Sequence, residues 1–345
     1  MTGCASLDRE LSTIVDDPAR PLSSLSVLAV RGGEVVYQRQ FGRRHIDPDL
    51  PLNEATLFRV ASISKLVVTL GVLRLVEEKK LDLDVDAGIR NPNFRDTPIT
   101  LRMLLTHTSS MLDDGSYSTA KPGTAFSYAN PPWRVVGAMM EKATGERCDR
   151  LMKRLVVDPL GLSGGFNIAE LPAERIANVA TLYRKATTGD VQVWDPKGPW
   201  IVQADDYTTR PPEVPTSFAP QGGFRATAAD LGRVMRMLMN GGELDGQRFL
   251  PKAAIDSMFS ARLGSEQFTD LVEGRPFNAV GHHGNAYGLR SLLAFDRATK
   301  NGFVYLVGGT GFDPATDPGA YSPRPRFMER IATALWYGAI EGQGP

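Results

Sequence analysis

Apolar positions along the chain follow two periods, one typical of helices and one typical of strands. In the stretch that opens at Ser62, apolar side chains recur with the 3.6-residue period of a helix, at Ile63, Leu66, Val67, Leu70 and Leu73. This spacing predicts a helix that begins at Ser62. Similar reasoning predicts further helices at residues 7–15, 100–106, 132–144, 146–157 and 327–337, and one from a capping-box-like Thr227-Ala-Ala-Asp230 to Gly241-Gly242.

Two segments at opposite ends of the chain predict β-hairpins. Residues 25–42 carry strand-forming side chains on both sides of Gly32-Gly33, whose glycines supply the positive φ angles of a tight turn. Residues 289–295 and 303–307 form a matching pair around the turn sequence at 299–302. The two hairpins predict one antiparallel sheet built from both ends of the chain, with the terminal helices covering a face of it.

These elements predict an α/β fold of the α+β type in two parts. Residues 1–60 and 225–345 would form a sheet domain flanked by helices, and residues 61–224 a mostly helical domain. Within the latter, residues 167–223 follow neither period and contain scattered aromatic residues, among them Trp194, Trp200 and Tyr207. Such a stretch is often a lid or a pocket wall, but it is equally an excursion that its aromatic side chains anchor to the core.

Composition narrows the possible partners. Among 345 residues, 39 Lys and Arg balance 39 Asp and Glu, so no overall charge attracts nucleic acid. The longest apolar stretch, 66–76, contains Arg74 and is too short to span a bilayer. Two cysteines and four histidines without a His-Glu-x-x-His pair give no familiar zinc signature. We therefore expect no nucleic-acid partner, transmembrane segment, cofactor or metal, while the oligomeric state is left open.

The first residues bear on localisation. Met-Thr-Gly-Cys4-Ala-Ser resembles the cleavage box of a bacterial lipoprotein, but the charged and apolar regions of a leader do not precede it. If Cys4 is a remnant of such a box, the protein belongs in the cell envelope or periplasm. If the match is chance, the cytoplasm is expected.

Serine with a lysine partner is the best candidate for a nucleophile. Cys148 lies in a predicted helix as a small side chain. Ser-x-x-Lys occurs twice, at Ser62–Lys65 and at Ser118–Lys121. The second copy runs into Pro122-Gly123, which breaks a helix, whereas Ser62 opens one and places Lys65 on the same face. A neutral Lys65 at a helix start could act as a base toward Ser62; the plain alternative is an N-cap serine.

Two later segments offer polar groups that could complete a site. Tyr128 and Asn130 precede Pro131-Pro132, and a tyrosine beside a lysine can have its pKa lowered and relay a proton. Gly281-His282-His283-Gly284-Asn285 precedes a predicted strand, where a glycine lets the backbone approach a ligand closely. Because neighbours on a strand face opposite sides, we expect His282 and His283 to be too far apart to bind one ion.

Taken in order, Ser-x-x-Lys, Tyr-Ala-Asn and His-x-Gly resemble the serine β-lactamase and penicillin-binding-protein-like superfamily, in its class C-type branch. That branch contains class C β-lactamases, DD-peptidases, D-aminopeptidases and family VIII carboxylesterases. Further segments that look like the family's are 58–65, 104–109, 122–130 and 222–231, so that the resemblance extends over roughly residues 25–310. It implies a β-lactamase/DD-peptidase-like fold.

The resemblance also implies roles for individual residues. Ser62 would be the acylated nucleophile, Lys65 would take or shuttle its proton, and Tyr128 would protonate the leaving group and help to activate water. Asn130 would orient the substrate, and His282, His283 and Gly284 would occupy the Lys-Thr-Gly position on the strand that lines the cleft. The backbone N–H groups of Ser62 and Asn285 would form the oxyanion hole.

Departures from the family pattern point to the substrate. Where class C β-lactamases carry a lysine, this chain has His282, and a neutral histidine does not suit a β-lactam carboxylate. We therefore expect a carboxylesterase acting on small esters through an acyl-enzyme. The alternatives are a D-amino-acid peptidase or DD-carboxypeptidase, a β-lactamase, an acyltransferase, and a β-lactam or peptidoglycan sensor that does not turn over.

Overall fold

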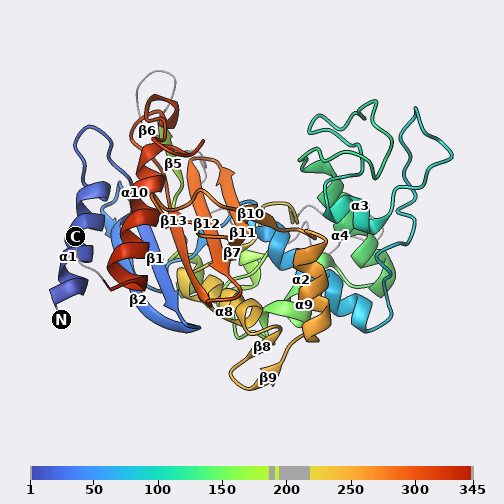
Figure 1. Ribbon diagram of the computed structural model, residues 1–345, viewed down its shortest axis with the longest axis horizontal. Helices are drawn as coiled ribbons and strands as arrows, with labels where there is room; N and C mark the ends of the chain where they lie inside the picture. Colours follow the sequence, from blue (N-terminus) through green and yellow to red (C-terminus); the bar gives the residue numbers. More distant parts are fainter. Residues whose placement is uncertain (1, 186–190, 194–217, 343–345) are drawn as a thin grey trace.

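A seven-stranded antiparallel sheet forms one half of the molecule, in the order β10-β11-β12-β13-β1-β2-β3 (Figure 1). The computed structural model describes residues 2–185, 191–193 and 218–342. The strands of the sheet are β1 (Ser24–Arg31), β2 (Glu34–His45), β3 (Leu50–Pro51), β10 (Glu266–Phe268), β11 (Ala279–Ala286), β12 (Leu289–Asp296) and β13 (Asn301–Val307). Because β1 pairs with β13 along its length, both ends of the chain meet at the centre of the sheet, as the two hairpins predicted.

Side chains alternate along β1 and separate two hydrophobic cores. Leu28 and Val30 point into the core that also holds the helices of the middle of the chain. Val27 and Ala29 point to the other face, where they pack with the terminal helices. The alternation follows from the period of two of a strand, and a central strand that is apolar at every position must be covered on both faces.

Helices cover both faces of the sheet. The terminal elements α1 (Thr2–Val15), α10 (Arg326–Ala334) and the π-helical turn η4 (Leu335–Ile340) pack on one another and on one face (Figure 1). On the other face α8 (Ala228–Met239) lies against β1, β12 and β13. The predicted capping box is confirmed at its start, since the side chain of Thr227 accepts from the N–H of Asp230 and Asp230 accepts from the N–H of Thr227. Gly241 and Gly242, both with positive φ, follow its end.

The buried helix α2 (Ile63–Glu77) joins the sheet to the remaining helices and runs beside β11. The other helical elements are α3 (Leu101–Leu105), α4 (Pro131–Thr144), α5 (Cys148–Met152), α6 (Ala173–Ile176), α9 (Lys252–Ser260), the π-helical turn η1 (Lys153–Val157) and the 3₁₀ turns η2 (Ile168–Glu170) and η3 (Pro314–Thr316). Short strand pairs are β4 (Phe58–Arg59) with β7 (Arg225–Ala226), β5 (Tyr183–Lys185) with β6 (Val191–Val193), and β8 (Glu243–Leu244) with β9 (Gln247–Arg248).

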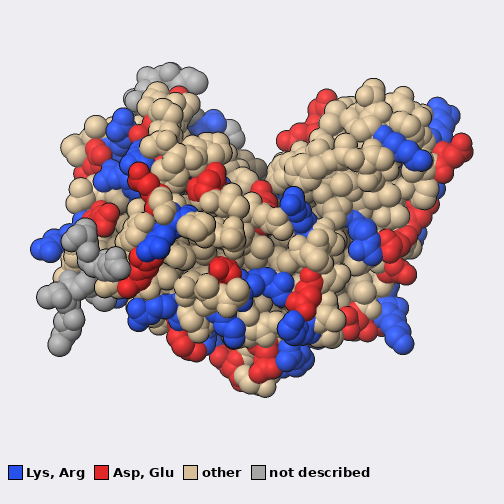
Figure 2. Space-filling model, in the orientation of Figure 1, with Lys and Arg blue, Asp and Glu red and all other residues tan. Residues whose placement is uncertain are grey.

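The architecture is the predicted one, a large antiparallel sheet with helices, whereas the division at residues 60 and 225 stays a prediction. Trp194, Trp200 and Tyr207 lie outside the described residues. In the part of the chain that the structure describes, no helix is long and apolar enough to cross a membrane. On the face shown in Figure 2, basic and acidic side chains are interspersed over the surface.

Candidate active site

Ser62 sits where the chain enters α2, in an irregular turn. Ala61 has a φ of 49°, in the left-handed region that non-glycine residues rarely adopt, so the chain bends sharply just before the serine. Ser62 occupies the N-cap position, but its side chain makes no capping hydrogen bond. Its Oγ instead lies 2.8 Å from Lys65 Nζ and 2.8 Å from Tyr128 Oη. The contacts are those of a candidate nucleophile, and the side chain of Ser62 does not cap the helix at whose N-cap position it stands.

Lys65 is fully buried, one turn along α2 from Ser62. Besides Ser62 Oγ, its Nζ donates to Asn130 Oδ1 at 2.9 Å and to the carbonyl of Gln221 at 3.0 Å. Loss of solvent lowers the pKa of Lys65 to about 7, although the negative charges of Glu266 and Asp113 oppose the change. A substantial fraction of this lysine is therefore neutral near neutral pH, as a base must be.

Tyr128 approaches Ser62 from the loop before α4, and its phenol donates to Ser62 Oγ. Burial raises the pKa of Tyr128, against the lowering that the adjacent lysine led us to expect. Lys65 fails to lower it because Lys65 is itself buried and only partly charged. Tyr128 is thus a protonated hydrogen-bond donor at neutral pH.

His107 supports the ring of Tyr128. The two rings stack with centroids 4.4 Å apart, and His107 Nδ1 accepts from the backbone N–H of Ala129 at 3.2 Å. Burial, with the charge of Lys65, lowers the pKa of His107 to about 3, so the ring is neutral. The sequence marked His107 only as part of a family-like segment, and nothing in its neighbours distinguished it from a core histidine.

Both the oxygen and the nitrogen of the Asn130 side-chain amide make hydrogen bonds within the site. Its Oδ1 accepts from Lys65, and its Nδ2 donates to Asp113 Oδ1 at 3.1 Å. Asp113 also accepts from the backbone N–H of Asn130 at 2.8 Å. Asn130 therefore positions Lys65 through its oxygen and has one Nδ2 hydrogen left for a substrate. The sequence did not predict Asp113, which lies in a turn-rich loop.

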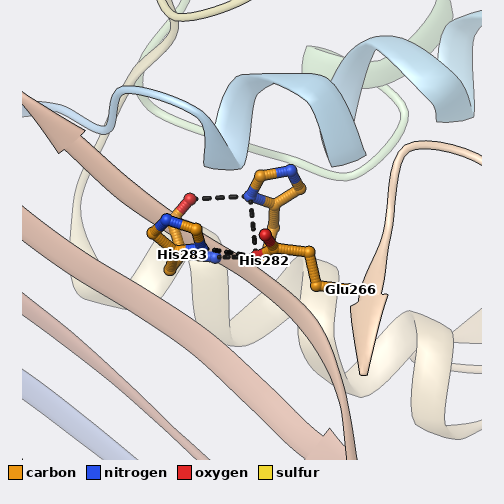
Figure 3. A group of neighbouring side chains, drawn as sticks. All are labelled: Glu266, His282 and His283. Atoms are coloured by element: carbon orange, nitrogen blue, oxygen red, sulfur yellow. Dashed lines mark hydrogen bonds and ion pairs between the residues drawn. The ribbon is translucent and has the colours of Figure 1, made fainter. Parts of the chain in front are cut away.

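Glu266, His282 and His283 converge at the edge of the sheet, where β10 pairs with β11 (Figure 3). Glu266 Oε2 accepts from the backbone N–H of His283 at 2.9 Å and lies 2.6 Å from His283 Nδ1. His282 Nδ1 lies 2.6 Å from the carbonyl oxygen of His283, to which it donates, and 3.4 Å from Glu266 Oε2. Both imidazoles thus reach one carboxylate, and the expectation that they point too far apart to share an ion is wrong. The reason is that His282 folds back along the strand toward the next carbonyl group.

The same arrangement determines the charges of His282 and Glu266. Burial lowers the pKa of His282 to about 4, so His282 is neutral near pH 7. For Glu266 burial acts in the opposite sense, but the histidines and the backbone N–H outweigh it and lower the pKa to about 2. On this side of the cleft the structure therefore places the neutral ring of His282 beside the carboxylate of Glu266. Glu266 could not be predicted, because its only sequence signal is one acidic residue in a short edge strand.

Gly284 brings β11 against the turn that carries Ser62. A Cβ atom on Gly284 would lie 2.5 Å from the carbonyl oxygen of Val60 and 2.2 Å from Ser291 Oγ. Ser291 in turn donates to the carbonyl of Val60 at 3.1 Å. Only a glycine lets the strand lie this close to the turn that carries Ser62.

A cleft of about 600 Å³ opens beside Tyr128. The residues that line it include His107, Phe126, Glu266, His282, His283, Arg262 and Arg324. Phe126 is 68% exposed, which is unusual for a large apolar side chain and suits a surface that contacts substrate.

The second Ser-x-x-Lys is not assembled in this way. Among the described residues, Lys121 makes no hydrogen bond to Ser118, whose Oγ accepts from the N–H of Ala120 at 3.4 Å. Ser64, the other serine near the site, is buried and accepts from the N–H of Phe224 at 3.0 Å. Of the serines considered, only Ser62 is joined to a lysine and a tyrosine.

The profile of the beta-lactamase family matches residues 10–322, which is most of the chain. The chain belongs to the beta-lactamase family. This is a family of serine hydrolases that includes esterases and peptidases and acts on ester, amide and β-lactam bonds. The fold and the family predicted from three short motifs are thereby confirmed.

Relatives within the beta-lactamase family differ in what they do. Esterase EstB of Burkholderia gladioli is 31% identical over 209 residues, which is 48% of this chain and 53% of EstB. The structure of the octameric penicillin-binding protein homologue from Pyrococcus abyssi covers 99% of this chain and 79% of its own, at 20% identity and a TM-score of 0.73. The structure of EstCE1, described as a hydrolase with promiscuous acyltransferase activity, covers 96% of this chain and 99% of its own, at 20% identity and a TM-score of 0.66. Both structures share the fold.

Proposed function

We propose that this protein is a carboxylesterase that hydrolyses small esters through a covalent acyl-enzyme on Ser62. The observation that carries the proposal is the placement of Ser62 Oγ 2.8 Å from both a buried lysine amine and a protonated tyrosine. The two partners have pKa values shifted in opposite directions, Lys65 down and Tyr128 up, which gives one the character of a base and the other that of an acid.

Acylation uses Lys65 as the base. A neutral amine has two hydrogens and one lone pair; the acceptors Asn130 Oδ1 and the Gln221 carbonyl hold the hydrogens. The lone pair is then left for the hydroxyl hydrogen of Ser62. As Ser62 Oγ forms its bond to the ester carbonyl carbon, its proton passes to Lys65, and the carbonyl π electrons move to the oxygen.

Tyr128 completes acylation as the acid. The tetrahedral intermediate collapses, the bond to the alkoxy oxygen breaks, and that oxygen takes the phenol proton to leave as an alcohol. Water then attacks the acyl carbon and gives a proton to the Tyr128 phenolate. As the bond from the acyl carbon to Ser62 Oγ breaks, Oγ takes a proton from the Lys65 ammonium, which releases the carboxylic acid and restores Ser62, Lys65 and Tyr128.

Backbone groups would hold the developing oxyanion. The N–H of His283 points away from β12, since it donates to Glu266. Because N–H directions alternate along a strand, the N–H of Asn285 points to the same side, beyond the last residue of β11 that pairs with β10. Together with the N–H of Ser62 it is our candidate oxyanion hole.

The preference for esters follows from the wall of the cleft. A β-lactam or a C-terminal peptide presents a carboxylate, which favours a cation opposite it. Here His282 is neutral and Glu266 is ionised, so this wall repels rather than binds a carboxylate. The similarity of about half of the chain to the esterase EstB supports the same choice.

The test is turnover of a short-chain p-nitrophenyl ester and of a chromogenic cephalosporin by the wild type, Ser62→Ala and Ser118→Ala. We expect ester hydrolysis that Ser62→Ala lowers by a factor of at least about 1,000 and that Ser118→Ala leaves intact. Cephalosporin cleaved faster than ester would favour a β-lactamase. An acyl adduct on Ser62 that lasts for hours would favour a sensor, and full activity in Ser62→Ala would overturn the assignment of the nucleophile.

A further inference from the structure

Three potential metal ligands meet at one end of the cleft beside Tyr128. The ligand atoms of Glu266, His282 and His283 all lie within 4.8 Å of one another, and Figure 3 shows them converging from two neighbouring strands. Glu266 Oε2 is the common point, 2.6 Å from His283 Nδ1 and 3.4 Å from His282 Nδ1. Among the residues that the structure describes, this is the one group of three with such geometry.

The two histidines and the glutamate offer ligand atoms that suit Zn²⁺ and similar divalent metal ions such as Co²⁺. Two imidazole nitrogens and one carboxylate oxygen leave a fourth tetrahedral position open to solvent or substrate. In the metal-free protein, protons occupy the Nδ1 positions and bridge to Glu266 and to the carbonyl of His283. When a cation binds, each imidazole would offer the lone pair of Nδ1 and carry its proton on Nε2 instead.

Glu266 lacks a permanent cation as a partner. Its ion-pair neighbours among the described residues are the two histidines, with no Lys or Arg within that distance. Its side chain is 23% exposed and lies against the buried ring of His282. A divalent cation would give this largely buried carboxylate the fixed positive charge that no Lys or Arg of the described residues supplies within ion-pair distance.

The site is open to an ion from solution. All three residues line the 600 Å³ cleft, and the side chain of His283 is 43% exposed at its mouth. The ring of His282 is buried, with its centroid 6.2 Å from that of Tyr128. An ion held here would therefore lie in the cleft, on the same lining as Tyr128.

We infer that Glu266, His282 and His283 form a binding site for a divalent transition metal of the zinc group, and that its occupancy inhibits the enzyme. The metal takes up space in the cleft and draws the ring of His282 away from its carbonyl partner beside Tyr128. The inhibitory half of the inference rests on the proposed esterase function, whereas binding of the metal does not.

Binding is tested first, by calorimetric titration of the metal-free protein with Zn²⁺ and by visible absorption with Co²⁺, whose tetrahedral complexes absorb strongly. We expect one ion per chain, and affinity weakened at least about tenfold by His283→Ala and by Glu266→Gln. His45→Ala is the matched control, because His45 lies on β2 outside the cluster and contacts Thr181. No saturable binding in the wild type, or equal binding by all variants, would overturn the site. Circular dichroism verifies that each variant is folded.

Inhibition is tested on the same samples. We expect Zn²⁺ to lower ester turnover of the wild type over the concentration range in which it binds, and a chelator to restore it. The turnover of each variant with Zn²⁺ is compared with its own metal-free rate. His283→Ala and Glu266→Gln should need at least about tenfold more Zn²⁺ than the wild type for the same degree of inhibition. Zinc that binds at the cluster without slowing turnover would overturn inhibition. A metal-free protein that lacks esterase activity would refute the proposed function, while the calorimetric result would still decide the site.

Discussion

At the scale of single residues, burial determines the chemistry of Lys65 more than charge does. Two carboxylates raise its pKa, yet loss of solvent lowers it to about 7. The amine is held by two acceptors that suit its neutral form, so the fold prepares a base from a residue that is normally charged. Neither the depth of burial nor Gln221 can be recognised from the Ser-x-x-Lys motif alone.

The pH dependence of ester hydrolysis tests this role of Lys65. Because only the neutral amine accepts a proton, kcat/KM should fall about tenfold per pH unit below an apparent pKa of about 7 and level off above it. Lys65→Arg, which keeps a permanent cation, should lower kcat/KM by at least about 100-fold and lose this limb. An acid limb near pH 4 to 5 in the wild type would instead indicate a carboxylate base.

The residue at position 282 should control the choice between substrates. His282→Lys places a cation where the carboxylate of a β-lactam would lie, and a charge-assisted hydrogen bond contributes about 1.5–3 kcal/mol. We therefore expect the ratio of cephalosporin to ester kcat/KM to rise at least about tenfold, measured for both substrates at one pH. His45→Lys, which adds a lysine away from the cleft, should leave the ratio as it is. An unchanged ratio in His282→Lys would show that charge at this position does not set the preference.

At the scale of elements, short sequence patterns predicted helices and hairpins, but they did not predict how strands distant in the sequence pair. The helix opened by Ser62, the capping box at Thr227 and both hairpins follow from short patterns. The edge strand β10 was missed, since three residues carry no period. For that reason the cluster around Glu266 escaped prediction, although both histidines were recognised. Glu266 lies on a different strand from the histidines, and the pairing of the two strands depends on the tertiary structure.

The contact between β11 and the turn before α2 should be intolerant of any side chain. Gly284→Ala would place a methyl group 2.5 Å from the Val60 carbonyl and 2.2 Å from Ser291 Oγ, so the strand or the turn must move. We expect a loss of about 1–3 kcal/mol in the free energy of unfolding and a fall in kcat, because the displaced turn carries Ser62. Chemical denaturation and steady-state kinetics would measure both.

Gly165→Ala is the matched control for that substitution. A Cβ atom at Gly165 meets nothing within 4 Å, so stability and kcat should both stay near their wild-type values. Equal behaviour of the two alanine variants would show that the close approach of β11 is not required.

At the scale of the whole molecule, one sheet links the chain ends to the candidate site. Leu11 of α1 is fully buried in the core on the far side of the sheet from α2. Leu11→Ala should lower the free energy of unfolding by about 2–5 kcal/mol. Because the sheet is continuous, activity and secondary structure should be lost in one transition at a lower denaturant concentration. Thr13→Ala, on the exposed side of the same helix, is the control. Two separate transitions would mean that the terminal core melts on its own.

The pairing of β1 with β13 also has a consequence in time. Synthesis makes the apolar strand β1 well before β13, its partner at residues 301–307. At translation rates of about 5–20 residues per second, β1 waits many seconds with one edge unpaired, a period in which a nascent chain is prone to aggregate and depends on chaperones. Ser62 likewise precedes by far the strand β11 that faces it. A nascent chain that has not yet made β11 and β13 therefore leaves an edge of β1 unpaired and leaves the turn that carries Ser62 without the strand that packs against it.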